Sequence, residues 1–404
     1  MTGAHWQPFL VALVVAFAVS LRFFPKLRGF QFTAWIVAAV TAALVYPAHF
    51  LHVGSLDLRQ PWLILCVVQL VMFGMGTQMG LRDFAGVLRA PRGVVVGILC
   101  RFTVMPLTGW ALIKIFHFDP EIAAGVILIG SCSSGLASNV MAYLAKSNLA
   151  LSVTITAVTT VAAVVMTPFW MKVLAGQLVE VKFLNLMLEI IRIVLVPIGA
   201  ALLHDYLKSA SGRGRRIVFG LAGVGAVWLL FSVAGGWDWL HLSVPSATAV
   251  GIAGFLLGAV LWGCIYHQLT LRFRRLDQWM PLLSMAGIIY FTAITTAAGR
   301  DNLLRVGGCL LLVAILHNTV GYTLGYWLAR AAGLDKNSAR SVAFEVGIQN
   351  GGMASGIAGA AGQLGTMGLA AAIFSPWMNV SGSLLANYWR KRPVKQESSL
   401  PPGA

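Results

Sequence analysis

Apolar segments long enough to cross a bilayer recur along the whole chain, with only short polar connections between them. They run approximately from Phe9 to Phe24, Phe30 to Phe50, Pro61 to Gly80, Gly93 to Phe116, Ile122 to Leu144, Leu149 to Leu174, Phe183 to Leu203, Ile217 to Gly235, Ala247 to Tyr266, Pro281 to Ala298, Val306 to Ala329, Val342 to Ala361 and Gly368 to Trp389. A membrane helix needs roughly 20 such residues. The pattern therefore predicts an all-α membrane protein with about 13 transmembrane helices.

Two of these segments contain polar and glycine-rich stretches where a membrane helix should be most apolar. Residues 343–356 include Glu345, Gln349, Asn350 and four glycines, and residues 131–139 include several serines and an asparagine. Glycine and buried polar groups at membrane depth are typical of a helix that is broken where it lines a cavity. A pair of interrupted segments in corresponding halves indicates the binding site of a secondary transporter.

The second half of the chain repeats the order of the first half. Arg101–Pro106 precedes the first interrupted segment by a short connection, and His317–Gly321 precedes the second in the same way. An odd number of membrane segments separates the two units, so they enter the membrane from opposite sides. We therefore expect an inverted-repeat transporter with two discontinuous helices.

The composition supports a polytopic membrane protein. The 404 residues are 58% hydrophobic and only 10% charged, with a mean hydropathy of +0.81. The net charge of +16 comes from short basic clusters between apolar segments, which is a topology signal and not the footprint of a nucleic-acid partner. The sequence contains neither a phosphate-binding glycine loop nor an inserted soluble module. The energy for transport would then come from an ion gradient.

The basic residues also predict the orientation. Most of the 29 lysines and arginines fall in one set of alternate connections, for example Arg82, Lys146, Arg215 and Arg340. The positive-inside rule places this set in the cytoplasm. We expect a multi-pass protein of the bacterial inner (cytoplasmic) membrane with its amino terminus outside and its carboxyl terminus inside.

Glu345 is the strongest candidate for ion chemistry. A carboxylate inside a membrane segment needs a partner or a function, and hard cations prefer oxygen ligands from carboxylates, amides and main chain. Ser138 and Asn139 supply further oxygens from the other interrupted segment. Ser152 and Thr156 lie one helical turn apart on the apolar segment that follows it. The alternative is a buried acid that is paired with an arginine or is protonated.

Several short motifs lie at the interrupted segments and near them: Met72–Gly76, Val126–Gly130, Ala137–Ala145, Ala150–Val153, Leu316–Asn318 with Gly321 and Tyr322, Glu345–Asn350, and Asn379–Leu385. Together they resemble the bile acid:sodium symporter family, in its bacterial branch. The resemblance extends from Phe30 to Trp389 apart from one insertion. Its ASN and EVGxQN elements occur in order, at the two expected helix breaks.

The resemblance implies ten helices in two inverted five-helix repeats, with a panel domain and a core domain whose two broken helices cross. On that basis residues 1–29 form an extra amino-terminal helix, 30–175 the first repeat and 183–390 the second repeat. Residues 212–278 would interrupt the second repeat as an extra helix pair beside the panel helices. Residues 391–404 are polar and are expected to be a disordered cytoplasmic tail.

The resemblance also implies two sodium sites. The first comprises Ser138, Asn139, Ser152, Thr156 and Glu345. The second comprises Glu345, Val346, Ile348, Gln349 and a glutamine of the helix in which this chain has Arg101. A guanidinium cannot ligate a cation. We therefore expect one coupled Na+ and a degenerate second site that Arg101 fills or neutralises, unless Arg101 holds an anionic substrate, turns toward the membrane surface or pairs elsewhere.

The predicted function is sodium-coupled symport of a small organic anion, such as a carboxylate, by alternating access. Substrate contacts would come from Asn350 and Asn379, with Leu136 and Met378 shaping the pocket. The first alternative is a proton-coupled or uncoupled facilitator or exporter. The second is an intramembrane enzyme, which the absence of aspartate-rich and HExxH motifs disfavours. The expected partners are the substrate anion and the lipid bilayer, and the substrate's identity and the oligomeric state are left open.

Overall fold

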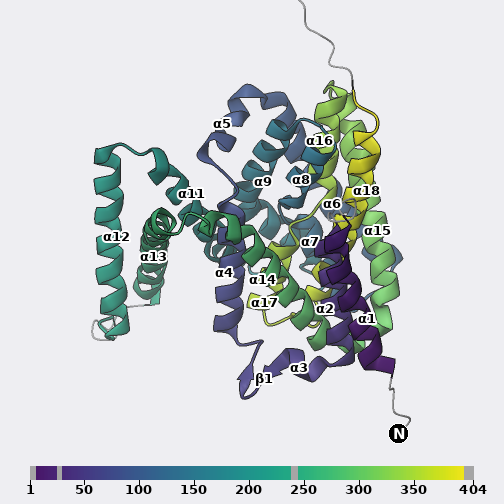
Figure 1. Ribbon diagram of the computed structural model, residues 1–404, viewed down its shortest axis with the longest axis horizontal. Coiled ribbons are helices and arrows are strands. Elements are labelled where there is room, and N and C mark those ends of the chain that lie inside the picture. Colours follow the sequence, from purple (N-terminus) through teal and green to yellow (C-terminus); the bar gives the residue numbers. More distant parts are fainter. Residues whose placement is uncertain (1–5, 25–29, 238–243, 395–404) are drawn as a thin grey trace, which may run out of the picture.

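The computed structural model describes residues 6–24, 30–237 and 244–394, almost all of them helical (Figure 1). The elements in order are α1 (Trp6–Ser20), η1 (Leu21–Phe23), α2 (Gln31–Val45), α3 (Pro47–Leu51), β1 (His52–Val53), β2 (Leu56–Asp57), α4 (Pro61–Gly76), α5 (Leu81–Arg89), α6 (Pro91–Ile115), α7 (Pro120–Ser131), α8 (Ala137–Leu144), α9 (Leu149–Trp170), η3 (Met171–Ala175), α10 (Phe183–Ile190), η4 (Ile191–Leu195), α11 (Val196–Ser209), α12 (Gly212–Val233), α13 (Val244–Arg272), α14 (Leu276–Ala298), α15 (Arg300–Ala331), α16 (Lys336–Gly347), α17 (Gly351–Ala360) and α18 (Gly368–Arg390).

Every predicted apolar segment coincides with helical structure. Among the described residues, nine helices are long and apolar enough to span a membrane alone, or ten if the bent pair α4 and α5 counts as one. The remaining predicted segments correspond to the shorter helix α2 and to the pairs α7–α8 and α16–α17. Those two pairs do not qualify as single spanning helices because each is interrupted. The expectation of a polytopic all-α fold is confirmed.

Both predicted helix breaks are present. Between α7 and α8 the chain becomes extended at Cys132, with φ −70° and ψ 167°. Between α16 and α17 it becomes extended at Ile348, with φ −98° and ψ 119°. The next helix then starts at a side-chain cap, because the Asn350 side chain accepts a hydrogen bond from the main-chain N–H of Met353 at 3.0 Å. The polar residues at the break thus restart the helix as well as interrupt it.

The two halves share one pattern of helices. A long helix (α6 or α15) leads into a half-helix of twelve residues (α7 or α16). A second half-helix of eight or ten residues follows the break (α8 or α17), and a long helix (α9 or α18) completes each unit. The units pack on one another in the body of the molecule (Figure 1).

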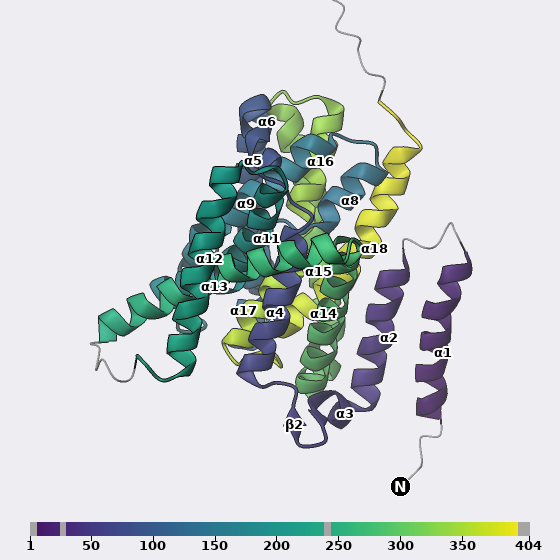
Figure 2. The same ribbon diagram turned by 60° about the vertical axis from the view of Figure 1, so that its left-hand side comes forward.

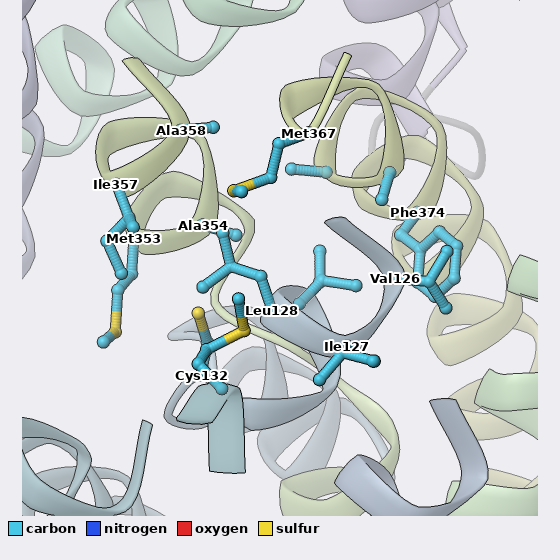
Figure 3. Close-up of a cluster of buried hydrophobic side chains, with 14 of the residues drawn as sticks. Val126, Ile127, Leu128, Cys132, Met353, Ala354, Ile357, Ala358, Met367 and Phe374 are labelled. Carbon is cyan, nitrogen blue, oxygen red and sulfur yellow. The ribbon is translucent and has the colours of Figure 1, made fainter. Parts of the chain in front are cut away.

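A buried apolar cluster surrounds the breaks (Figure 3). Val126, Ile127 and Leu128 of α7 pack with Met353 of α17 and Phe374 of α18, and all five side chains are at most 2% exposed. Inside a bilayer such packing stabilises through dispersion contacts, since lipid tails are as apolar as the side chains. The breaks are therefore held in a close-packed environment that fixes the positions of their polar groups.

The helices predicted to be extra, α1, α12 and α13, lie at the periphery. α13 packs against α11 and α12 packs against α13, so this pair projects from one side of the body (Figure 1). Residues of α4, α11, α12 and α13 line an apolar cavity of about 1170 Å³, with Phe73, Trp228 and Trp262 in its wall. α1 packs alongside α2 at another edge (Figure 2). Residues 1–5, 25–29 and 395–404 of the predicted amino-terminal unit and tail lie outside the described residues.

A short β-hairpin is present that the sequence pattern did not predict. β1 and β2 pair in antiparallel register, with His52 opposite Asp57, and Gly54 takes the left-handed φ of 60° in the turn. The Arg59 side chain donates to the Asp57 carboxylate at 2.8 and 3.0 Å, which lowers the pKa of Asp57 to about 2. Two-residue strands carry no recognisable alternation, so the hairpin was missed.

Candidate functional site

The two helix breaks lie against each other and pair through their main chains. The N–H of Asn350 donates to the carbonyl of Ser133 at 3.0 Å, and the N–H of Gly135 donates to the carbonyl of Ile348 at 3.3 Å. Ser134 and Gln349 form an isolated antiparallel bridge. Unpaired main-chain groups are costly at membrane depth. Each break therefore satisfies part of the backbone that the other leaves exposed.

Gly135 permits this close approach. A Cβ atom at this position would lie 2.5 Å from the main-chain oxygen of Gln349, well inside van der Waals contact. The neighbouring atom belongs to the backbone of the other break and cannot rotate away. Any side chain at residue 135 would consequently push the two breaks apart.

Five side chains converge on one buried point, and we call them the hydroxyl–carboxylate cluster: Ser138, Asn139, Ser152, Thr156 and Glu345. Glu345 Oε1 lies 2.6 Å from Ser138 Oγ and 2.5 Å from Ser152 Oγ, and Glu345 Oε2 lies 2.8 Å from Thr156 Oγ1. Asn139 Oδ1 lies 2.9 Å from Ser152 Oγ and 3.2 Å from Thr156 Oγ1. Glu345 has no exposed surface. The structure thus brings the predicted residues of the first ion site together.

The cluster has more oxygen–oxygen contacts than hydrogens to occupy them. Each hydroxyl has one hydrogen to donate. Ser152 and Thr156 each face both Glu345 and Asn139, while Ser138 faces Glu345 and also the carbonyl of Gly135 at 2.7 Å. Several acceptor oxygens must therefore face one another without a hydrogen between them. A cation among them would satisfy these oxygens.

Glu345 has no ion-pair partner within the described part of the chain, where no basic nitrogen lies within 4.0 Å of its carboxylate. The alternative of a carboxylate paired with an arginine is therefore wrong for this conformation. The charge must be balanced by a bound cation or removed by a proton, because a buried unpaired carboxylate is strongly disfavoured.

Arg101 lies at the junction of the two breaks and is completely buried. Its Nε and Nη2 donate to the carbonyl of Cys132 at 3.1 and 2.5 Å, and Nη2 also donates to the carbonyl of Ser133 at 2.9 Å. Its Nη1 donates to the carbonyl of Val346 at 2.9 Å. We call this set the Arg101 junction. The side chain does not extend toward the membrane surface, so that alternative is wrong.

The junction occupies part of the predicted second ion site. The carbonyl of Val346 accepts from Arg101 and also from Gln349 Nε2 at 3.0 Å, and the carbonyl of Ile348 accepts from Gly135. These oxygens therefore face N–H donors. Gln349 Oε1 is buried without a partner. The predicted residues are adjacent, as expected, but a guanidinium and an amide serve the carbonyls that a cation would otherwise bind.

The four predicted substrate residues flank the crossing and are mostly engaged in internal contacts. Asn350 caps α17 and its Nδ2 lies 3.3 Å from Ser133 Oγ. Met378 Sδ accepts from the N–H of Gln349 at 3.2 Å, and Asn379 donates to the carbonyl of Ser375 in its own helix at 2.8 Å. Asn350 and Met378 are buried, while Asn379 and Leu136 are partly exposed.

Sequence reasoning missed two contributors. Ser134 Oγ donates to the main-chain oxygen of Glu345 at 2.8 Å and so links the first break to α16. Asn318 of α15 donates to the carbonyl of Gly347 at 2.5 Å and accepts from Ser381 Oγ. α15 is the helix of the second unit that matches α6, and each of these helices carries a side chain that donates to a break carbonyl. In the alignment of residues 101–106 with 317–321, Asn318 stands opposite Phe102, so the alignment indicated the helix but not the residue.

Two broken helices that cross within a polytopic all-α chain define the fold of a transporter. The family model described as "Sodium Bile acid symporter family" matches residues 65–236. The chain is 30% identical over 378 residues to the Bacillus subtilis protein described as the uncharacterized sodium-dependent transporter YocS, covering 94% of this chain and 96% of that protein. This protein belongs to the sodium bile acid symporter family, a family of sodium-dependent transporters, and resembles its bacterial members.

Other relatives extend the family beyond bacteria. The Arabidopsis thaliana protein described as the probable chloroplastic sodium/metabolite cotransporter BASS1 is 29% identical, covering 94% of this chain and 78% of that protein. The human ileal sodium/bile acid cotransporter is 27% identical, covering 78% and 73%. Among solved structures, the sodium proton antiporter MjNhaP1 from Methanocaldococcus jannaschii superposes with a TM-score of 0.56 at 10% identity, covering 96% of this chain and 98% of that chain. That likeness shows a shared fold alone.

Proposed function

We propose that this protein couples the transport of a small organic anion to one Na+, which binds in the hydroxyl–carboxylate cluster. The observation that carries the proposal is the surplus of oxygen contacts around Glu345. A hard cation prefers carboxylate, amide and hydroxyl oxygens together, and a monovalent one balances the charge of the Glu345 carboxylate. The sodium dependence that the names of the relatives state agrees with this role.

Arg101 takes the place of a second sodium ion in this proposal. It supplies a permanent positive charge and satisfies the carbonyls of Cys132, Ser133 and Val346 without an ion. Its side chain is fully buried, and Nε, Nη1 and Nη2 all donate within the junction. Arg101 is therefore a structural cation and not a direct substrate ligand. The proposed stoichiometry is one Na+ per transport cycle.

The amino ends of α8 and α17 meet near the crossing, which favours an anionic substrate. Helix amino ends carry positive partial charge, and α8 has no side-chain cap at its first turn. We assign the substrate to the space beside these ends, with Leu136 and Asn379 as contacts and the buried Asn350 and Met378 as support. The symport is of a carboxylate-type anion, and the family name alone does not specify a bile acid here.

Alternating access would move a core domain against a panel domain. In this scheme the core comprises α6–α9 and α15–α18, and the panel comprises α2, α4, α10–α11 and α14. The first repeat spans residues 30–175 and the second spans 183–390, with 212–278 as an insertion that packs on α11. The basic connections lie in the cytoplasm of a bacterium, with the amino terminus outside and the carboxyl terminus inside.

Proton coupling is the second candidate, and one feature favours it. A proton on Glu345 would also remove its charge and supply one of the missing hydrogens. The occupied second site agrees with a mechanism that needs fewer ions. In this version a proton gradient would replace the sodium gradient as the driving force for transport.

A sodium titration of thermal stability separates the two candidates. Potassium at equal ionic strength is the reference, and Glu345→Gln is the test variant. The matched control is Glu180→Gln, because the Glu180 side chain is 79% exposed. Ligand binding stabilises by RT ln(1 + [L]/Kd), so at 100 times Kd sodium should add about 2.7 kcal/mol.

We expect a sodium-specific rise in melting temperature in the wild type and in Glu180→Gln, and none in Glu345→Gln. A wild-type melting temperature that does not change with sodium concentration but depends on the protonation of Glu345 would favour proton coupling. A sodium rise that persists in Glu345→Gln would place the ion elsewhere.

A further inference from the structure

A large polar cavity lies away from the crossing, where the ends of several helices meet. It has a volume of about 1180 Å³ and is bordered by the α8–α9 connection, the end of α15, the start of α16 and the residues after α18. Five cationic side chains line it: Lys146, Arg330, Lys336, Arg340 and Arg392. We call this cavity the basic pocket.

The only carboxylate in the described lining of the pocket is Asp335, and it is already engaged. It accepts hydrogen bonds from the main-chain N–H groups of Asn337 at 2.8 Å and Ser338 at 3.1 Å, as the cap of α16. Partial burial acts to raise the pKa of Asp335, but these hydrogen bonds outweigh it and the pKa lies below the usual value. No ion pair within the described residues joins any of the five cations to an acid. The pocket therefore has an unbalanced positive charge.

Arg340 provides a hydrogen-bond donor at the pocket. Only 8% of the residue is exposed, and its Nη2 donates to the carbonyl of Arg392 at 2.9 Å. Its guanidinium carbon lies 5.5 Å from the centroid of the Trp389 ring, and its buried Nη1 has no hydrogen-bond partner among the described residues. An unsatisfied buried donor is costly, and more so when it is charged. A guanidinium with a free N–H group at a cationic cavity is a binding group for an oxyanion.

Lys146 supports the same conclusion through its backbone. Its φ of 52° is the only positive value at a non-glycine position in the described chain. It follows the end of α8, where the N–H of Ser147 donates to the carbonyl of Ala142 at 3.0 Å, a helix ending that usually has glycine. Lysine is disfavoured in this conformation. A long cationic side chain at such a position suggests that its charge is required in the pocket.

We propose that the basic pocket binds a phosphate group. A phosphate offers several oxygens and up to two negative charges, and it matches converging guanidinium and ammonium donors better than a carboxylate does. The cavity is much larger than phosphate alone and has room for an organic part of the ligand. The headgroup of an anionic phospholipid and a soluble phosphate ester share this chemistry.

A bound phosphate would stabilise the packing of α16 against the α8–α9 connection, and these elements carry the hydroxyl–carboxylate cluster. Ser341 Oγ lies 2.8 Å from the carbonyl of Asn148 and 3.0 Å from Ser147 Oγ, and Ser341 is one helical turn from Glu345. The pocket lining includes Asn148 and Arg340, so the pocket lies beside this junction of the α8–α9 connection with α16. The inference rests on the pocket itself and is independent of which ion or substrate is transported.

The test measures the melting temperature of the full-length protein, purified free of lipid, with two probes. One is potassium phosphate against potassium chloride at equal ionic strength and pH. The other is phosphatidylglycerol against phosphatidylcholine in mixed micelles. The variants are Arg340→Gln and Lys146→Gly, and the control is Arg275→Gln, an exposed arginine outside the pocket.

We expect one probe to raise the melting temperature of the wild type. Arg340→Gln should lower the affinity for that probe at least about tenfold, as for one lost charge-assisted hydrogen bond. Lys146→Gly should raise the melting temperature without ligand, because glycine adopts the positive φ of this position without strain. The same variant should have a lower affinity for the probe. A response to inorganic phosphate identifies a soluble ester, and a response to phosphatidylglycerol alone identifies a lipid headgroup.

Three outcomes would overturn the proposal. The first is no response to either probe. The second is an equal loss of response in Arg275→Gln, which would indicate only surface charge. The third is phosphate binding that appears only after residues 395–404 are deleted, because the carboxylate of Glu397 would then be the natural occupant.

Discussion

The hydroxyl–carboxylate cluster and the Arg101 junction are built from the same two helix breaks but solve the problem of buried oxygens differently. In the cluster, a carboxylate and three hydroxyls share too few hydrogens. In the junction, the acceptors are neutral carbonyls, and one guanidinium supplies a fixed donor to each. In the proposed mechanism a mobile cation or proton balances the first arrangement, which can therefore change state during transport. The second is complete and cannot release its charge.

Changing Arg101 should give the largest effect. Arg101→Gln leaves the carbonyl of Cys132 without its donor, while the carbonyls of Ser133 and Val346 keep the N–H of Asn350 and Gln349 Nε2. An unsatisfied carbonyl costs about 1–3 kcal/mol, and each lost hydrogen bond to a charged group costs about 1.5–3 kcal/mol. In potassium we expect a loss of roughly 3–6 kcal/mol of stability, on the same basis. In sodium buffer the freed carbonyls and the new amide oxygen should bind a sodium ion, which should restore much of the lost stability.

The measurement is the difference in melting temperature between sodium and potassium, together with the number of sodium ions bound. Arg101→Lys is the control, because it keeps the charge but loses the forked geometry of the donors. It should be destabilised without gaining a second ion. If Arg101→Gln binds the same number of sodium ions as the wild type, the junction does not replace a cation site.

Gly135→Ala should have the next largest effect, because both sites depend on the close contact of the breaks. Its Cβ would lie 2.5 Å from the main-chain oxygen of Gln349. Overpacking of this kind costs typically 1–3 kcal/mol, and here it also separates Ser134 from α16. We expect lower stability and weaker sodium binding together.

Gly220→Ala is the matched control for that substitution. Gly220 lies in α12, and a Cβ there would meet nothing within 4 Å. The change should be neutral or stabilising, because alanine favours the helix. Equal losses at residues 135 and 220 would show that the crossing has no special steric demand.

Much of this comparison could be read from the sequence. The interrupted apolar segments located both breaks, and the rarity of a carboxylate in a membrane segment identified Glu345. Ser152 and Thr156 followed from helical periodicity, since both belong to one face of α9. The adjacency of Arg101 to the second site rested on family resemblance, because nothing in its local sequence specifies which carbonyls it reaches.

What the sequence could not supply depends on contacts between distant segments. Arg101 donates to residues 31 and 245 positions away, and such pairings depend on how whole helices cross. The substrate role of Asn350 stays a prediction, and its role as the cap of α17 arises because the first turn of a helix offers nearby N–H groups to an asparagine side chain. The β-hairpin at residues 52–57 is set by one glycine turn and an ion pair, which leave no periodic pattern.

A smaller substitution tests whether the hydroxyls of the cluster bind the ion or only support the fold. Thr156→Val keeps the shape of the side chain and removes the oxygen that lies 2.8 Å from Glu345 Oε2. Thr160→Val makes the same change one turn along α9, where the hydroxyl donates to the carbonyl of Thr156 at 2.8 Å. Both residues are at most 2% exposed, so their structural costs should be similar, about 1 kcal/mol. Only Thr156→Val should weaken sodium binding, by about tenfold for the loss of one ligand worth about 1.4 kcal/mol. Sodium titrations of the two variants compare them directly, and equal sodium affinities would mean that Glu345 binds the ion without the help of Thr156.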